Sequence, residues 1–333
     1  MTPVELSRTV LRAVRRAVDE GELSVAVPVR AVVTPPGPGG CGDYATNIAL
    51  QLARSAGRPP RQVAEILRPH LAGTDGVTDV AITGPGFLNI RLADAAVASL
   101  VREIQRGSYG HGDALAGQTV PLRIPYDVRA EVVADAVVRI VATQGGRAEV
   151  RHAEPVNLRP VPASEDPTPL GPDAARWALL HPAGHDRPRI TADHLVQRES
   201  NPLFRVRYAH ARTRALTSNA AALGYTGAPG DVRQAEGIPG APGDGPHADH
   251  LLGALADHPH ALSVAATHRA PDRLARHLVS TADALLAFQH TVLPLGDDKP
   301  SAAHRARLAL AEAAGTVLAG GLSLLGISAP DHL

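Results

Sequence analysis

A proline-rich stretch from residue 155 to residue 172 limits what this chain can fold into more than any other feature of the sequence. Proline lacks a backbone N–H donor and has a fixed φ, so such a run fits neither a helix interior nor a central strand. We therefore predict an extended linker here, with separately folded parts on either side. The prolines are Pro155, Pro160, Pro162, Pro167, Pro169 and Pro172.

The part before this linker mixes helical and strand patterns. Residues 4–18 repeat apolar side chains at three- and four-residue steps, and residues 77–92 alternate as strand, Gly-Pro-Gly turn and strand. These patterns predict an α+β N-terminal domain over residues 1–108. Residues 119–152 then follow a strand, helix, strand pattern, so we predict a vestigial α/β (βαβ) connector over residues 119–160.

The part after the linker is predicted to be helical. Asn201 and Pro202 form a helix start, with Asn as the cap and Pro at the first helical position, and Gly224 ends the helix. The Gly/Pro-rich residues 225–246 are expected to form a mobile surface loop before further helices. We predict a C-terminal all-α helical bundle over residues 161–333.

Charge and composition exclude several classes of protein. The 33 basic and 33 acidic side chains give no net charge, which argues against a globally basic nucleic-acid coat but not against a local patch. A single cysteine, Cys41, excludes an internal disulfide framework and a cysteine-based zinc site. No apolar run is long enough to cross a bilayer, and charges interrupt the N-terminal apolar positions, unlike in a signal peptide. We therefore expect a cytoplasmic protein with no cofactor.

Several histidines and glycines resemble chemical sites without completing one. The segment from His181 to His185 is similar to the His-x-Gly-His phosphate motif of class I synthetases, but it has one residue too many and follows a helix. The glycines around Cys41 lack the Lys-Ser/Thr pair of a phosphate loop, and Cys41 has no histidine partner in a recognisable order. Four histidines lie close together in the sequence, but no carboxylate or cysteine completes a zinc-ligand pattern with them. We therefore interpret them as solvated loop residues and not as a zinc site. The four are His247, His250, His258 and His260.

The strongest local signal is a basic helix. Residues 201–222 contain four arginines and no acidic residue, and Arg205, Tyr208 and Arg212 fall on one helical face. Guanidinium groups pair with phosphates and aromatic rings stack on unpaired bases, so this face is a candidate RNA-binding surface. The alternative for an isolated helix is a solvated face with Tyr208 in the core.

Several segments, in the same order, resemble arginyl-tRNA synthetases. GDYATNIALQLA at 42–53 and GPGFLNIRL at 84–92 are similar to the N-terminal additional domain of that family. NPLFRVRYAHAR at 201–212 and the helical segment at 305–330 resemble parts of its DALR-type anticodon-binding bundle. GPDAARWALL at 171–180 resembles the helix that leads into this bundle. The resemblance implies the same three-part fold that the patterns predict.

The resemblance also implies two tRNA-binding surfaces. The aromatic and Asn of the family's Gly-aromatic-x-Asn turn meet the tRNA D-loop, and they match Phe87 and Asn89. A ring there stacks on a splayed base, and an amide hydrogen-bonds the edge of a base. The Tyr and Arg of Tyr-Ala-x-Ala-Arg contact the anticodon, and they match Tyr208 and Arg212. Arg205 stands where the family usually has Tyr.

The anticodon surface differs from the family pattern. Leu285 and Gln289 replace later aromatic residues, and Leu333 stands where the family often has Met. Each lost stacking ring removes about 1–3 kcal/mol of binding, whereas Arg205 adds phosphate affinity without base information. The resemblance therefore implies a weaker, less anticodon-selective and salt-sensitive RNA binder.

The family's catalytic signatures are missing. The segment at 134–151 resembles the one that follows the His-x-Gly-His signature, but PLRIPYDVRAEVV at 121–133 stands in place of the signature. Lys-Met-Ser-Lys cannot occur, because Met1 and Lys299 are the only residues of their types. Adenylation needs these groups to stabilise charge on the transferring phosphates. Residues 119–160 are thus expected to be a remnant of the catalytic domain, without aminoacylation activity.

Three functions remain open from the sequence. The first is a catalytically inactive protein that binds tRNA, most simply arginine-accepting tRNA, as an accessory to another tRNA-using enzyme. The second is a protein-interaction module that partners a synthetase or a biosynthetic enzyme and has lost RNA binding. The third is a small-molecule enzyme on the βαβ core, for which we find no paired carboxylates, nucleophile–base order or metal set.

Overall fold

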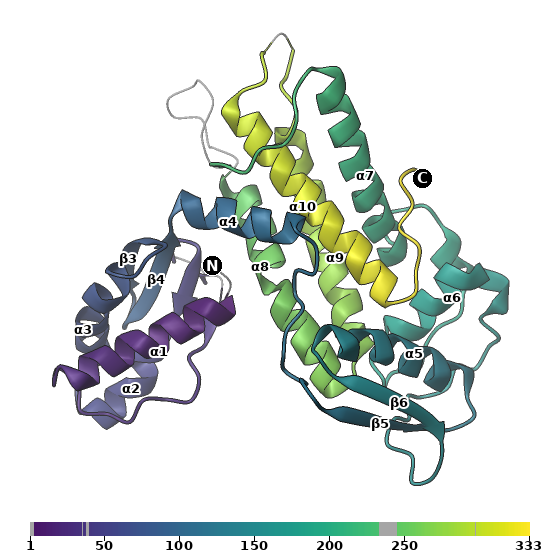
Figure 1. Cartoon of the computed structure of the whole chain (residues 1–333), viewed down its shortest axis with the longest axis horizontal. Coiled ribbons are helices and arrows are strands. Elements are labelled where there is room, and N and C mark those ends of the chain that lie inside the picture. Colours follow the sequence, from purple (N-terminus) through teal and green to yellow (C-terminus); the bar gives the residue numbers. More distant parts are fainter. Residues whose placement is uncertain (1–2, 35, 38–39, 233–244, 297) are drawn as a thin grey trace. The chain divides into compact units, whose positions relative to one another are not determined.

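The computed structural model describes residues 3–34, 36–37, 40–232, 245–296 and 298–333. It divides into two compact units, Met1–Leu100 and Val101–Leu333 (Figure 1). The observed fold class is the predicted one: an α+β N-terminal unit, then a short α/β connector, then a helical bundle. The boundaries 1–108, 119–160 and 161–333 stay a prediction.

The N-terminal unit is built on an antiparallel sheet with strand order β1-β2-β4-β3. Buried Leu88 and Ile90 on β4 face the helices and form part of the core. The strands are β1 (Val33–Thr34), β2 (Tyr44–Thr46), β3 (Val77–Thr83) and β4 (Phe87–Leu92). The helices are α1 (Pro3–Asp19), α2 (Ile48–Ala56), α3 (Pro60–Ala72) and α4 (Asp94–Gln105), the last of which crosses into the second unit.

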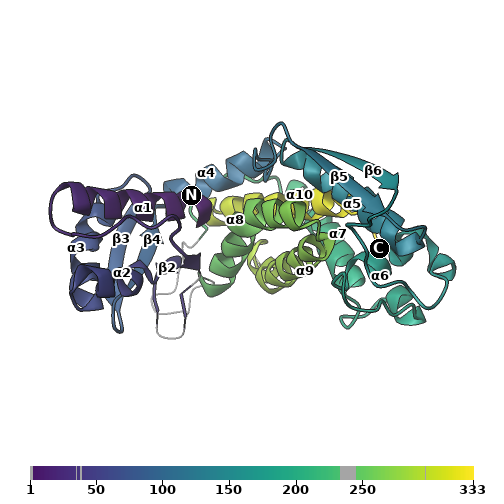
Figure 2. The same ribbon diagram turned by 90° about the horizontal axis from the view of Figure 1, so that it is seen from below.

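The connector is the predicted βαβ unit. Strands β5 (Thr119–Ile124) and β6 (Arg147–His152) pair in parallel, and α5 (Val128–Thr143) joins them (Figure 2). The carboxylate of Asp127 caps α5 by accepting a hydrogen bond from the Ala130 N–H at 3.0 Å. A sheet of two strands is too small to be stable alone. Helix α5 packs on three helices of the bundle, α6 (Gly171–Leu180), α8 (Gly245–His268) and α9 (Pro271–Phe288).

The proline-rich stretch is held to the connector and the bundle by the buried side chain of Arg129. Its guanidinium donates to five backbone carbonyl groups, at distances of 2.6 to 3.0 Å. Burial lowers the pKa of this arginine, although Asp127 and Asp186 oppose that effect. As predicted, residues 155–167 form neither helix nor strand, but Thr168–Leu170 form a 3₁₀ turn and Gly171 begins a helix, so the prediction of an extended linker is wrong for residues 168–172. The stretch packs as part of the folded unit. The carbonyl groups belong to Val161, Leu179, Pro182, Ala183 and Asp186.

The bundle forms around the small-residue helix α10. A Cβ atom at Gly315 would lie 2.5 Å from Thr213 Oγ1, and one at Gly321 would collide with Leu278, so these glycines let α7 and α9 approach α10 closely. The helices are α6 (Gly171–Leu180), α7 (Pro202–Ala222), α8 (Gly245–His268), α9 (Pro271–Phe288) and α10 (Ala302–Leu324). Short 3₁₀ turns are Thr168–Leu170, Ala192–Leu195 and Gln289–Thr291.

The Gly/Pro-rich loop is packed in its described part. Tyr225 is buried, and its hydroxyl donates to the Val292 carbonyl at 3.2 Å. The Ala228 N–H donates to the Arg305 carbonyl at 2.9 Å. The expectation of a mobile loop is therefore wrong for residues 225–232, and residues 233–244 lie outside the described part. Of the described helices, none is long and apolar enough to cross a membrane.

Candidate nucleic-acid interface

Phe87 lies at the start of β4, directly after the turn that joins it to β3. The turn glycines Gly84 and Gly86 have φ values of 53° and 139°, which L side chains rarely adopt. A Cβ atom at Gly86 would also lie 2.8 Å from the backbone of Pro60, so the turn sits against the start of α3. This turn presents the Phe87 ring at the surface, with 39% of the residue exposed.

Asn89 is buried inside the same hairpin. Its Nδ2 donates to Thr83 Oγ1 at 2.7 Å, and its Oδ1 accepts a hydrogen bond from the Cys41 N–H at 3.4 Å. Residue Asn89 faces Ala81 on β3 and Ala45 on β2. The amide that the resemblance assigns to a base edge is therefore bonded within the domain, where it fixes the hairpin that carries Phe87.

The second predicted surface lies along α7. Asn201 caps this helix as predicted, since its Oδ1 accepts hydrogen bonds from the N–H groups of Leu203 and Phe204 at 3.1 and 3.4 Å. Tyr208 is 40% exposed, and its ring stacks on Phe204 with centroids 5.6 Å apart. Tyr208 thus lies at the surface and not in the core.

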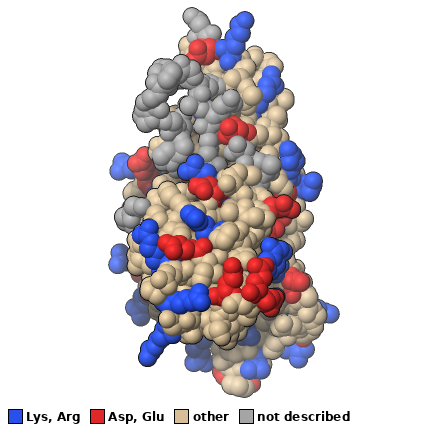
Figure 3. Space-filling view, turned by 90° about the vertical axis from the view of Figure 1, so that its left-hand side faces the viewer, with Lys and Arg blue, Asp and Glu red and all other residues tan. Residues whose placement is uncertain are grey.

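The arginines of α7 are paired with groups from other elements. Arg205 Nη1 lies 3.0 Å from Asp283 Oδ1 on α9, and Arg212 Nε donates to Gln289 Oε1 at 2.7 Å. Similarly, Arg207 Nη2 lies 3.6 Å from Asp173 Oδ2 on α6, and Arg214 Nε lies 3.0 Å from Asp331 Oδ1. The basic helix of the sequence is therefore largely charge-compensated in the fold. Figure 3 draws a different face, the left-hand side of Figure 1, where basic and acidic side chains are interspersed.

The two positions where the sequence departs from the family's aromatics have different surroundings. Leu285 is fully buried, so its side chain belongs to the core of the bundle. Gln289 instead bonds the guanidinium of Arg212 and so fixes its direction beside Tyr208. Among the five predicted binding residues, Arg205, Tyr208 and Arg212 therefore share α7, and Phe87 and Asn89 share β4.

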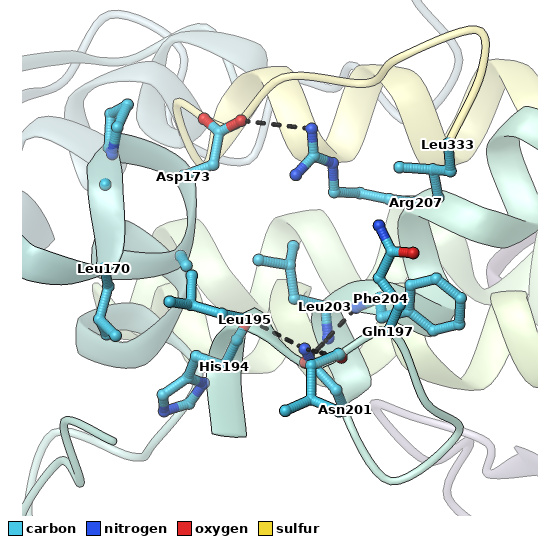
Figure 4. A pocket seen from close by; sticks show the side chains of 14 residues that line it. Leu170, Asp173, His194, Leu195, Gln197, Asn201, Leu203, Phe204, Arg207 and Leu333 are labelled. Atoms are coloured by element: carbon cyan, nitrogen blue, oxygen red, sulfur yellow. Dashed lines mark hydrogen bonds and ion pairs between the residues drawn. The ribbon is translucent and has the colours of Figure 1, made fainter. Parts of the chain in front are cut away.

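A cavity lies at the N-terminal ends of α6 and α7 (Figure 4). It has a volume of about 210 Å³, and Asp173 and Arg207 face one another across it. Arg207 Nε is buried and has no hydrogen-bond partner among the described residues. Leu333 lines the same cavity. Sequence reasoning missed Asp173, because its distance from Arg207 along the chain hides the pairing.

The four histidines interpreted as solvated loop residues all lie on helix α8, so the loop interpretation is wrong, and His258 is also not solvated. This residue is buried, and its ring lies 5.2 Å from that of His277 on α9. Burial lowers the pKa of His258 to about 3 and that of His277 to about 4. Both rings are therefore neutral at ordinary pH and belong to the helix packing.

Two other groups bear on cofactor or metal binding. His181 lies at the C-terminal end of α6, stacked on Trp177 with centroids 5.1 Å apart, and a helix N-terminus that could bind phosphate is not formed there. The metal-ligating atoms of Glu20, Glu22 and His70 lie within 4.8 Å of one another. Both glutamates are exposed, and His70 is already paired with Glu22 at 2.6 Å, so the group is explained as an ion pair.

Comparisons with known proteins match two separate parts of the chain. Residues 5–92 match the arginyl tRNA synthetase N terminal domain, and residues 206–333 match the DALR anticodon binding domain. The Arginine–tRNA ligase of Frankia alni is 40% identical over 157 residues, which cover 44% of this chain and 28% of the relative. The corresponding ligase of Renibacterium salmoninarum is 44% identical over 161 residues, which cover 44% of this chain and 29% of the relative.

These alignments span less than a third of the length of each relative. The solved structure of Thermus thermophilus arginyl-tRNA synthetase superimposes over 100% of both chains with a TM-score of 0.68 and 14% identity, a likeness of fold. Neither matched domain is a catalytic one. This chain therefore carries one segment similar to the arginyl tRNA synthetase N terminal domain and one similar to the DALR anticodon binding domain, with a short βαβ connector between the two matched segments.

Proposed function

We propose that this protein binds tRNA, with arginine-accepting tRNA as the preferred ligand, and does not aminoacylate it. The observation that carries the proposal is the exposure of aromatic rings in a chain that has only nine aromatic residues. Three of them are exposed, and two of these three, Phe87 and Tyr208, match the positions to which the resemblance assigns tRNA contacts. Aromatic rings that reach the surface are suited to stacking on unpaired bases.

The residues around these rings have distinct roles in the proposal. Asn89 is a positioning residue, because its bonded amide holds the hairpin that presents Phe87. Gln289 similarly orients Arg212, whose remaining N–H groups are available for the phosphate backbone. Arg205 is shared with Asp283, so it contributes less to phosphate binding than an unpaired arginine would.

The test is a filter-binding assay with an arginine-accepting tRNA transcript. We expect Tyr208→Ala combined with Arg212→Ala to weaken binding by about tenfold or more, because stacking contributes about 1–3 kcal/mol per base. Phe87→Ala is expected to weaken binding at the other surface by a similar factor. Tyr126→Ala, which removes the third exposed ring, is the matched control. Unchanged binding in both test variants would refute the proposed surfaces.

The absence of aminoacylation is tested separately. With arginine, ATP and tRNA present, we expect no charged tRNA above background, because this chain has neither catalytic signature. Charged product that depends on the protein would contradict this part of the proposal. An accessory role, in which the bound tRNA is held for another tRNA-using enzyme, is the purpose that we propose for such binding.

A second candidate is a protein-interaction module without RNA binding. The observation that favours it is the charge compensation of α7, whose arginines pair with Asp173, Asp283 and Asp331. A pull-down with and without ribonuclease separates the two functions. Partners that are lost after ribonuclease treatment support tRNA binding, and partners that persist in a chain without tRNA affinity support the interaction module.

A further inference from the structure

The two outer edges of the β5–β6 sheet differ. On β5, Arg123 N–H donates to Asn157 Oδ1 at 2.8 Å, and the Asn157 N–H donates to the Arg123 carbonyl at 3.0 Å. Asn157 Nδ2 also donates to the Pro121 carbonyl at 3.0 Å, while Pro121 itself has no N–H at this edge. The side chain and backbone of Asn157 therefore cover the edge of β5.

The outer edge of β6 is open. Arg147 N–H donates to the carbonyl of Gln118, next to the start of β5, at 2.9 Å. The peptide groups of successive residues in a strand point in alternate directions. The peptide groups of Ala148, Val150 and His152 therefore point away from β5, toward the outer edge. Within the described part of the chain, β6 has β5 as its one strand neighbour. Val150 at the middle of this edge is 41% exposed. Open edges of this kind are sites where another strand can pair.

An exposed aromatic pair lies at one end of this edge. Tyr126 is 87% exposed, and its ring stacks on His152 with centroids 4.1 Å apart and planes 4° apart. His152 Nε2 lies 3.8 Å from Glu131 of α5, so the pair lies on the α5 side of the sheet, as does Val150. Tyr126 is the third exposed aromatic residue, and the proposed tRNA surfaces do not use it.

We propose that two copies of this chain pair through β6 in antiparallel orientation, with Val150 of one copy opposite Val150 of the other. The sheet then continues as β5-β6-β6-β5 across the two copies. Val150 and the Ala148–His152 pairs exchange backbone hydrogen bonds, since these are the residues whose peptide groups face outward. The small side chain of Ala148 comes opposite His152, which leaves room for the Tyr126 ring.

Charge selects this register. On the side away from α5, Glu149 of each copy comes opposite Arg151 of the other, at the pair type where opposing side chains are closest. Within one copy these two residues already form an ion pair at 3.2 Å. Sliding one copy by two residues in one direction brings Glu149 opposite Glu149, and in the other direction it brings Arg151 opposite Arg151. The strand is therefore self-complementary in one register.

The test measures the molar mass of the protein by light scattering over a range of concentrations. We expect wild type to dimerise, and we expect Glu149→Arg and Arg151→Glu each to raise the dimer dissociation constant about tenfold or more, because both cross-strand pairs become repulsive. Glu149→Arg combined with Arg151→Glu in one chain restores opposite charges and should restore the dimer. An equimolar mixture of the two single variants should form a heterodimer.

Glu65→Arg is the matched control, because Glu65 forms an exposed ion pair with Arg61 at 3.6 Å on α3. It should leave the dissociation constant unchanged, and circular dichroism should show all variants folded. A wild-type chain that stays monomeric at every concentration overturns the proposal. A dimer that the single variants leave intact, or that the double variant does not restore, overturns it equally. These outcomes are independent of tRNA binding, since the β6 edge shares no residue with the proposed tRNA surfaces.

Discussion

The hairpin that carries Phe87 and the helix that carries Tyr208 present similar rings in different ways. The two residues are 39% and 40% exposed. On the hairpin, the neighbouring polar side chain, Asn89, is turned inward and bonded to its own domain. On α7, the neighbouring polar side chains stay at the surface, but carboxylate or amide groups from other elements pair with them.

This difference shows which part of a binding surface a linear pattern can reveal. The hairpin is local, so its turn glycines and its aromatic residue stand together in the sequence. The charge of α7 is set by the tertiary fold, because Asp283 lies 78 residues from Arg205. The absence of acidic residues from a helix therefore does not predict a basic surface, because residues distant in the sequence can pair with its arginines.

The free energies of unfolding of the two units should differ most in their response to acid. Burial lowers the pKa values of His258 and His277 to about 3 and about 4, below the ordinary 6.5. The unfolded chain takes up these protons near the ordinary value while the folded chain does not, so the stabilisation is complete above that pH and is lost as the pH falls toward the lowered values. Between about pH 7 and about pH 5 we expect the bundle to lose about 2 kcal/mol of unfolding free energy per histidine.

Urea unfolding followed by fluorescence of Trp177, which lies in the bundle, measures this loss. The variant with His258→Gln and His277→Gln should show much less dependence on pH. His268→Gln, at an exposed position on α8, should keep the wild-type dependence. Equal pH dependence in wild type and in the double variant would contradict the assignment.

A second experiment compares the two residues of the hairpin. Asn89→Ala leaves the Cys41 N–H and Thr83 Oγ1 without their partner inside the N-terminal unit. We expect the free energy of unfolding of this unit to fall by about 1–3 kcal/mol. Phe87→Ala should cost less, because part of its ring is already in water. Hydrogen exchange of the N-terminal unit measures the loss of unfolding free energy in each variant. Equal losses in the two variants would show that Asn89 does not hold the hairpin.

The smallest expected effect concerns charge compensation on α7. Asp283→Asn removes the charge that pairs with Arg205, so the guanidinium becomes available to phosphate. If tRNA binds at α7, we expect its affinity to rise by about two- to fivefold at low salt, with a salt slope steeper by about 0.9. Asp135→Asn, which breaks an ion pair with Arg139 on α5, is the control. A flat response would mean that Arg205 lies outside the binding surface.

Much of the fold was predictable because its determinants are local. Apolar periodicity predicted the βαβ connector, and Asn201 with Pro202 predicted the start of α7. The sequence did not reveal that Asn89 is bonded inward, that His258 meets His277, or that residues 225–232 pack on the bundle. Each of these depends on a contact between distant segments. The roles of Phe87, Tyr208 and the three polar site residues in tRNA binding stay predictions.

The buried Arg129 has a practical consequence for dividing this protein into fragments. A polypeptide that begins at Gly171, where α6 starts, would contain the helices of the bundle but not the guanidinium that holds Leu179, Pro182, Ala183 and Asp186. Four carbonyl groups would then lose their donor, and burying them unpaired is costly. The connector and the bundle should therefore be expressed together, and limited proteolysis should cut the chain elsewhere before it cuts near Val161.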